Sequence, residues 1–201
     1  MRSDDAAGFG WFDRAPGVER YHRRLKHQII GLAPLRVYAP GAAVLDLGAA
    51  EGLIGFWLLE LGAVHLDAVE LVPARVARAR EIAATLPPGK TARIVEADLE
   101  DFAGAPPAGL RERYEIVLLL SIAQKLTQPA AFVAAAARRC GAVLALRLPE
   151  PTIKDARSHW RPLDVPALLR EEGFRPLGEP IRVPNGREGE RQEWLGLFER
   201  V

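Results

Sequence analysis

The residues that form disulfides and many protein metal sites are scarce in this chain of 201 residues. A single cysteine, Cys140, excludes an internal disulfide. The four histidines, His22, His27, His65 and His159, show no metal-ligand spacing with that cysteine, so we predict no metal site. Cys140 follows an alanine-rich stretch, which favours a packed side chain over a reactive nucleophile.

Long apolar runs and an excess of one charge are also missing. No segment approaches the roughly 20 apolar residues of a membrane span, and the start, MRSDDAAGFGWFDR, lacks the apolar stretch of a signal peptide. We therefore expect a cytoplasmic protein with no membrane partner. The formal net charge is +1, so no whole-molecule field attracts phosphate backbones, and nucleic acid is a less favoured partner.

What the chain does contain is typical of a globular protein. Hydrophobic residues make up 49% and charged residues 26%, and a chain of this length buries about 70% of the surface of its unfolded form. No internal repeat and no linker rich in Gly, Ser or Pro divides the sequence. We predict a single domain over residues 1–201, with an N-terminal helical cap at 1–40 and a core at 41–201.

The spacing of apolar residues predicts strands that alternate with helices. Two further strand-like runs, Ile181–Val183 and Glu193–Phe198, follow the last helix and are joined by a loop that contains Asn185-Gly186. The alternation is typical of an α/β fold with a parallel sheet, and the last runs predict an antiparallel strand at the end. The predicted strands lie at 43–47, 64–69, 92–96, 115–120 and 142–148, and the predicted helices at 18–33, 53–61, 73–86, 128–139 and 164–172.

The strongest motif is VLDLGAAEG at residues 44–52, where a strand ends in Asp46 and a glycine turn begins the next helix. It resembles the first motif, acidic-x-Gly-x-Gly-x-Gly, of the class I S-adenosylmethionine-dependent methyltransferases. The match falls on Asp46, Gly48 and Gly52, and Ala50 replaces the middle glycine. Glycine suits such a turn because a Cβ would collide with a ligand and because the turn demands positive φ. The alternative is a turn that only packs a helix onto a strand.

Two acidic residues after the next strands stand in register with this motif. Glu70 ends the following strand, 24 positions after Asp46, where one carboxylate can accept hydrogen bonds from both ribose hydroxyls. Asp98 follows the third strand, and the resemblance assigns it to the adenine amino group, although such a residue is also a common helix cap. A nicotinamide dehydrogenase would need glycine at position 53, where this chain has Leu53.

The resemblance covers residues 42–148 and implies both a fold and a cofactor. The fold is a Rossmann-like three-layer sandwich with a mostly parallel seven-stranded sheet in the order 3-2-1-4-5-7-6 and an antiparallel C-terminal strand. The cofactor is S-adenosylmethionine. The residues that the resemblance assigns to it are Asp46, Gly48, Ala49, Ala50, Gly52, Glu70, Leu71, Asp98, Leu99 and Ser121.

The acceptor end is less well defined by the sequence. The resemblance places reacting groups after the fourth and fifth strands, which here means Gln124, Lys125 and the loop 147–162. Many relatives that methylate small molecules have histidine after strand four, and this chain does not. We take His159 as the provisional base, because imidazole titrates near pH 6.5; a packing role in the loop is the alternative.

These features favour methyl transfer to a small polar acceptor, anionic or sugar-like. The loop 147–162 combines arginines with Trp160, which suits a charged or sugar-bearing ligand. Two alternatives stay open: an RNA methyltransferase that uses the basic segment 20–27, and a catalytically silent domain that binds S-adenosylmethionine. The sequence carries no indication of the oligomeric state.

Overall fold

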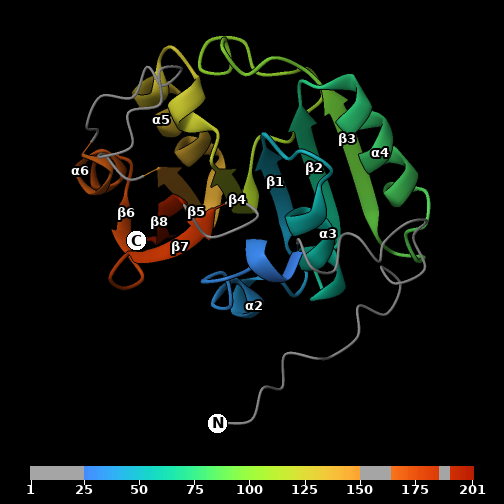
Figure 1. Ribbon diagram of the computed structural model, residues 1–201, viewed down its shortest axis with the longest axis horizontal. Coiled ribbons are helices and arrows are strands. Elements are labelled where there is room, and N and C mark those ends of the chain that lie inside the picture. Colours follow the sequence, from blue (N-terminus) through green and yellow to red (C-terminus); the bar gives the residue numbers. More distant parts are fainter. Residues whose placement is uncertain (1–24, 150–163, 186–190) are drawn as a thin grey trace, which may run out of the picture.

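The structure is a computed structural model that describes residues 25–149, 164–185 and 191–201 (Figure 1). Each strand and helix predicted wholly within these ranges is present, with ends that differ by a few residues. Of the helix predicted at 18–33, the described part is helical at residues 25–28 and continues as a turn. The strands are β1 (Ala43–Leu47), β2 (His65–Glu70), β3 (Thr91–Glu96), β4 (Tyr114–Leu120), β5 (Cys140–Pro149), β6 (Phe174–Pro176), β7 (Ile181–Asn185) and β8 (Arg191–Arg200). The helices are α2 (Leu35–Tyr38), α3 (Leu53–Glu60), α4 (Pro73–Ala83), the 3-10 turn η2 (Ala123–Lys125), α5 (Pro129–Arg139) and α6 (Val165–Glu171).

The strands form one mixed sheet in the order β3-β2-β1-β4-β5-β8-β6. Strands β1 to β5 are parallel, and β8 runs antiparallel to β5. Figure 1 shows this order across the picture, with β3 at the right and β6 and β7 at the left. The predicted parallel order and the antiparallel terminal strand are therefore confirmed.

The described residues form eight strands in this sheet, one more than the seven predicted. Strand β8 is ten residues long, and its outer edge pairs with two short strands instead of one: β6 pairs with residues 198–200 and β7 with residues 191–195. The segment between β6 and β7 contains Gly178 and Pro180. Both residue types interrupt strands, and proline at an edge removes a ladder donor. The strand predicted at Ile181–Val183 is present as β7, and β6 is an additional edge strand that was not predicted.

Helices cover both faces of the sheet and make the predicted three layers. One apolar core joins α3, α4 and residues 25–39 to the first face. The other joins α5 and α6 to the opposite face. The chain enters α4 and α5 through proline at the first helical position, where the missing N–H costs nothing. Cys140 is fully buried, and burial raises the pKa of its thiol to about 12, which agrees with the predicted packing role.

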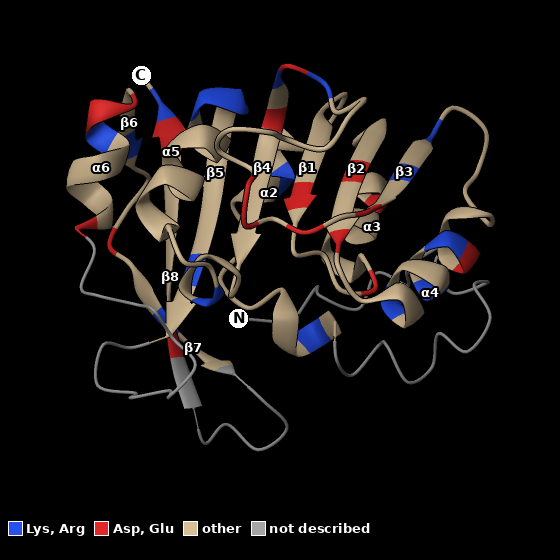
Figure 2. Cartoon of the chain, turned by 90° about the horizontal axis from the view of Figure 1, so that it is seen from above, with Lys and Arg blue, Asp and Glu red and all other residues tan. Residues whose placement is uncertain are grey.

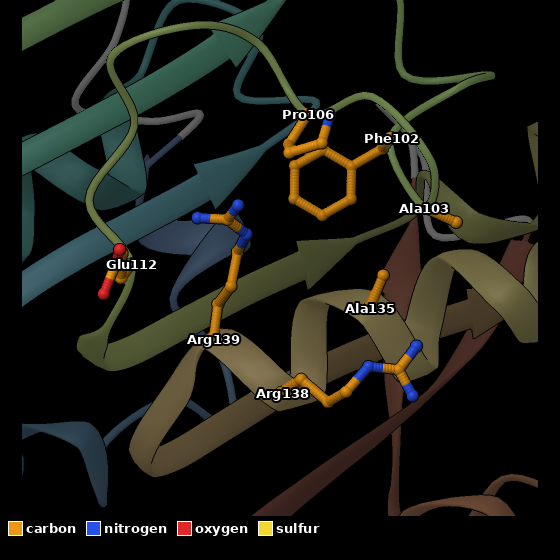
Figure 3. Close-up of a pocket in the computed structure, with 7 residues that line it drawn as sticks. All are labelled: Phe102, Ala103, Pro106, Glu112, Ala135, Arg138 and Arg139. Carbon is orange, nitrogen blue, oxygen red and sulfur yellow. The ribbon is translucent and has the colours of Figure 1, made fainter.

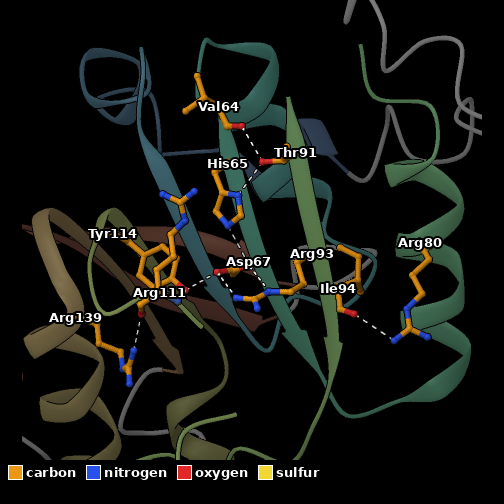
Figure 4. Close-up of polar contacts among 10 residues, drawn as sticks. All are labelled: Val64, His65, Asp67, Arg80, Thr91, Arg93, Ile94, Arg111, Tyr114 and Arg139. Carbon is orange, nitrogen blue, oxygen red and sulfur yellow. Dashed lines mark hydrogen bonds and ion pairs between the residues drawn. The ribbon is translucent and has the colours of Figure 1, made fainter. Parts of the chain in front are cut away.

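A buried polar network ties β2, β3 and β4 together on the face that carries α5 (Figure 4). Asp67 accepts hydrogen bonds from Arg93 Nε at 2.8 Å and from the Tyr114 hydroxyl at 2.5 Å. His65 Nε2 lies 3.1 Å from the same carboxylate. Burial alone would raise the pKa of Asp67, but these partners outweigh it and lower the pKa.

Two negative findings apply to the described residues only. None of their helices is long and apolar enough to cross a membrane. No three side chains among their histidines, cysteines and acidic residues are grouped so that they could hold a metal ion.

Candidate functional site

The carboxyl ends of the five parallel strands surround one large cavity of about 1130 Å³. This exceeds the roughly 300–1,000 Å³ of common ligand sites, so it has room for two small molecules side by side. Its wall brings together residues that are far apart in sequence. The lining includes Asp46, Gly48, Ala49 and Ala50 after β1, Glu70, Leu71 and Val72 after β2, Asp98, Leu99 and Glu100 after β3, Ser121 and Lys125 after β4, Arg147 on β5, and His27 and Gln28.

The glycine turn after β1 forms one wall of the cavity and has positive φ at alternate positions. The φ values are 77° at Gly48, 51° at Ala50 and 74° at Gly52. The N–H groups of Gly48 and Ala49 both donate to the Val69 carbonyl, which holds the turn against β2. A Cβ at Gly48 would come within 2.8 Å of Ile122, so glycine is required there for space as well as for conformation.

Ala50 is a non-glycine residue in the left-handed region, and this conformation costs about 1–2 kcal/mol for an L-residue. Glycine avoids that cost but has a larger entropy loss on folding, about 0.5–1 kcal/mol. We expect Ala50→Gly to raise the free energy of unfolding by about 0.5–1 kcal/mol, measured by urea denaturation.

The neighbouring residue offers a matched control, because Ala49 is outside the set of described residues with positive φ. Ala49→Gly should lower the free energy of unfolding by about 0.5–1 kcal/mol. Equal effects of the two substitutions would contradict the account of strain at Ala50.

Glu70 closes the other side of the turn. One carboxylate oxygen accepts the Ala50 N–H at 2.8 Å and the other accepts the Val72 N–H at 2.9 Å. The guanidinium of Arg75 lies 3.8 Å away. Each carboxylate oxygen has a second acceptor site, so Glu70 can still accept hydrogen bonds from a ligand. Beside it, Leu71 and Val72 expose apolar side chains in the cavity wall, 55% and 40% of each being accessible.

Asp46 lines the same cavity, although the residue is only 3% exposed. Burial raises its pKa to about 7, a hydrogen bond from the Gly55 backbone opposes this, and the charge of Glu70 adds to it. The carboxyl group therefore keeps its proton in the folded chain at pH values where the unfolded chain has already lost it.

The raised pKa of Asp46 makes the stability of the folded chain depend on pH, and the direction of this dependence can be tested. Between the ordinary aspartate pKa of 3.8 and about 7, the folded state binds more protons at this group, so its contribution to stability falls as pH rises through that window. We expect Asp46→Asn to remove this loss and to raise the free energy of unfolding of the ligand-free chain by about 1–3 kcal/mol at pH 8 but much less at pH 4.

Thermal denaturation at the two pH values measures this difference. Asp101→Asn is a suitable control, because that carboxylate is exposed in the loop after β3 and should leave the difference unchanged. An equal effect of Asp46→Asn at both pH values would show that the carboxyl group does not change its charge across this window.

The third predicted acidic residue also lies on the cavity. Asp98 lines it, and its Oδ1 accepts the Glu100 N–H at 3.0 Å, so it stabilises a local turn and does not cap a helix. Leu99 is buried beside it. Gly52 lies behind the cavity wall, where it precedes α3, and its contact with a cofactor stays a prediction.

The residues predicted at the acceptor end are only partly brought together. Lys125 lines the cavity, whereas Gln124 is buried in η2 outside the wall. Ser121, which the resemblance assigned to the cofactor, also lines the cavity. His159 lies outside the described residues, and its role as base stays a prediction. His27 lines the cavity from the N-terminal segment and was not proposed as a site residue.

Glu193 on β8 was also missed. It is 2% exposed and accepts a hydrogen bond from the Ser121 hydroxyl at 2.8 Å. An acidic residue at the start of the otherwise apolar run Glu193–Phe198 was the available signal in the sequence. Residues 193–198 were predicted as a strand, but nothing in the sequence indicated that Glu193 would contact Ser121 after β4.

A second hollow of about 360 Å³ lies between the loop after β3 and α5 (Figure 3). Its two arginines are already engaged: Arg138 pairs with Glu172 at 2.6 Å, and Arg139 donates to the Arg111 carbonyl at 2.6 Å. In Figure 3 the two guanidinium groups point in different directions. The hollow therefore presents no convergent set of free donors, and we assign it no site.

Comparisons with known proteins identify the fold. No protein-family model and no curated protein matches the sequence. The solved structure of magnesium protoporphyrin IX methyltransferase from Synechocystis PCC 6803, with bound S-adenosylmethionine, aligns over 98% of this chain and 92% of its own, with a TM-score of 0.68 and 18% identity. A putative RNA methyltransferase from Pyrococcus horikoshii aligns over 96% and 87%, with a TM-score of 0.58 and 18% identity.

The [4+2]-cyclase SpnF aligns over 87% of this chain and 80% of its own, with a TM-score of 0.66 and 11% identity. The chain therefore has the Rossmann-like fold of the S-adenosylmethionine-dependent methyltransferases, as the motif at residues 44–52 predicted. A cyclase with the same architecture shows that the fold alone does not define the reaction or the acceptor.

Proposed function

We propose that the chain binds S-adenosylmethionine in this cavity and transfers its methyl group to a small polar acceptor. The observation that carries the proposal is the convergence of the glycine turn, Glu70 and Asp98 on one cavity. Three segments that match the methyltransferase pattern in sequence thus meet in space at the carboxyl edge of the sheet. Ligands of open α/β sheets bind at this edge.

The cavity wall suits the parts of the cofactor. Glu70 would accept hydrogen bonds from the ribose hydroxyls, and Asp98 would accept one from the adenine amino group. The exposed apolar side chains of Leu71 and Val72 would pack against the adenosine, and the positive φ values of the turn leave the backbone open to close approach. Asp46 would face the cationic end of the cofactor from the buried end of β1.

S-adenosylmethionine supplies an electrophilic methyl group when it is bound. The chain's own residues would orient an acceptor atom in line with that methyl group. Positioning of this kind can lower a barrier by about 7–11 kcal/mol, and a general base adds a further factor of about 10²–10⁴. Ser121 and Lys125 lie on the acceptor side of the cavity. We propose positioning by these residues as the main contribution, with residues 1–40 as a cap that excludes water.

A small acceptor is favoured over RNA by the charges on the wall. Five acidic side chains line the cavity: Asp46, Glu51, Glu70, Asp98 and Glu100. Only three cationic side chains, Arg75, Lys125 and Arg147, lie among them. RNA binding normally uses a continuous basic groove, and the described residues do not form one at this cavity.

Methyl incorporation tests the proposal. The purified chain would be incubated with S-adenosylmethionine labelled in its methyl group and, in separate reactions, with a low-molecular-weight metabolite extract or with total RNA. We expect label in the metabolite fraction and none above background in RNA. Label in RNA would favour the alternative, and no label in either fraction would contradict methyl transfer.

A further inference from the structure

The two sides of the cavity carry opposite charges. The turn after β1 and the ends of β2 and β3 contribute the carboxylates, whereas the acceptor side contributes Lys125, Arg147 and His27. Figure 2 shows acidic residues at the carboxyl ends of β1 and β2 and basic residues at the carboxyl end of β5. Two residues depart from this division. Arg75 lies 3.8 Å from Glu70 on the acidic side, and Glu100 reaches toward the loop after β4, where its Oε2 accepts the Thr127 N–H and hydroxyl at 3.0 and 2.7 Å.

Arg147 is the central group of this basic side. It is 6% exposed, and its Nη2 donates to the Gln28 carbonyl at 2.7 Å, so β5 is tied to the N-terminal segment. Its Nε is buried and has no hydrogen-bond partner. The nearest carboxylate oxygen, Glu193 Oε2, lies 3.9 Å away, beyond the 2.7–2.9 Å of a charge-assisted hydrogen bond.

That carboxylate is instead engaged by Ser121, whose hydroxyl donates to the same Oε2 at 2.8 Å. Ser121 holds φ at 61°, a conformation unfavourable for a non-glycine residue. The Ser121 N–H also donates to the Arg147 carbonyl at 2.9 Å. A strained backbone and an incompletely paired buried arginine thus occur at one place, and such costs persist where a site requires them.

Resting on the proposed function, we propose that the acceptor is anionic and that Arg147, with Lys125 and His27, binds its carboxylate or phosphate group. Arg147 lines the cavity, and a guanidinium group donates charge-assisted hydrogen bonds to either group. Glu193 is a positioning residue that orients Ser121 and Arg147. Its carboxylate also reduces the positive electrostatic potential at the basic side of the cavity. The carboxylates on the opposite side would then serve the cationic cofactor, so one cavity separates two ligands of opposite charge.

Anion titration tests this site without knowledge of the acceptor. Inorganic phosphate and sodium acetate would be titrated into the full chain at constant ionic strength, with binding followed by calorimetry and by ³¹P line broadening for phosphate. We expect one site for at least one of the two anions, and the tighter anion identifies the group. Failure of both to bind the folded chain at tens of millimolar, as a rough upper limit for a site of this kind, would overturn the proposal.

Three variants separate recognition from a merely structural role. Lys125→Gln should weaken anion binding about two- to fivefold, a small effect because the side chain is exposed. Glu193→Gln should strengthen anion binding about two- to fivefold, because the negative charge that competes with the anion is lost while Ser121 keeps a hydrogen-bond acceptor. Arg138→Gln removes an exposed cation outside the cavity and should leave binding unchanged.

The direction of the Glu193 effect decides between the interpretations. A purely structural role predicts weaker binding in Glu193→Gln, and this result would overturn the proposal, as would equal losses in Lys125→Gln and Arg138→Gln. Titration of the same preparations with S-adenosylhomocysteine is independent of the anion. A chain that binds the nucleoside but no anion loses only this inference, whereas a chain that binds the anion but no nucleoside loses the proposed function.

Discussion

Replacing Glu70 with alanine is expected to weaken S-adenosylhomocysteine binding about ten- to a hundredfold. A charge-assisted hydrogen bond to a buried group contributes about 1.5–3 kcal/mol, and about 1.4 kcal/mol corresponds to a factor of ten in affinity. The structure adds a second reason, because the carboxylate also holds the Ala50 and Val72 N–H groups at 2.8 and 2.9 Å. Calorimetry of the folded variant measures the change.

Glu96→Ala is the matched control for this variant. Glu96 ends β3, pairs in register with Glu70 and is exposed outside the cavity wall. The substitution removes the same charge from the adjacent strand end and should change the affinity for S-adenosylhomocysteine less than about threefold, as expected for exposed charges. Unchanged affinity in Glu70→Ala, or an equal loss in both variants, would remove Glu70 from the binding site.

The largest stability effect is expected at Asp67. Asp67→Ala removes the carboxylate that pairs with Arg93 and accepts the Tyr114 hydroxyl. Breaking a buried pair costs about 3–5 kcal/mol. The partial exposure of Arg93, 39%, puts the expected loss near the lower end, about 3 kcal/mol, or about 6–12 °C in Tm. Urea and thermal denaturation of the ligand-free chain give this value.

Glu81→Ala is the control, because the Glu81–Arg78 pair lies on the exposed surface of α4 with Glu81 59% exposed. It should cost less than about 1 kcal/mol. The lowered pKa of Asp67 means that its stabilising contribution is present above about pH 4, the ordinary pKa of aspartate, and is lost as pH falls through the lower pKa of the folded state. A loss below about 1 kcal/mol in Asp67→Ala would contradict the role of the network.

Local patterns in the sequence predicted the sheet well, and they predicted residues that the structure brings to one cavity. Strand β1 was predicted with its observed ends, Ala43–Leu47, because a continuous apolar run ends there in a glycine turn. Parallel strands place their carboxyl ends at one edge, so Glu70 and Asp98 could be expected near that turn from their positions alone. The extra edge strand β6 could not, because its pairing beside β7 depends on the length of β8.

The acceptor side depends on contacts between distant segments, which sequence spacing does not encode. Arg147 donates to the Gln28 carbonyl across 119 residues, and Ser121 donates to Glu193 across 72. Nothing in the sequence therefore indicated that His27 lines the cavity or that Glu193 contacts Ser121 in its wall. His159 was chosen by residue type, and its place relative to the cavity stays a prediction.

Calorimetric titration of the wild-type chain with S-adenosylhomocysteine tests the central claim most directly. We predict one site per chain with a Kd in the range of about 1 μM to 1 mM that is usual for enzyme ligands. NADH, which shares the adenosine ribose but requires a different glycine pattern, should bind at least about tenfold more weakly. No binding of S-adenosylhomocysteine at about 1 mM by the folded chain, measured at two temperatures, would contradict the account.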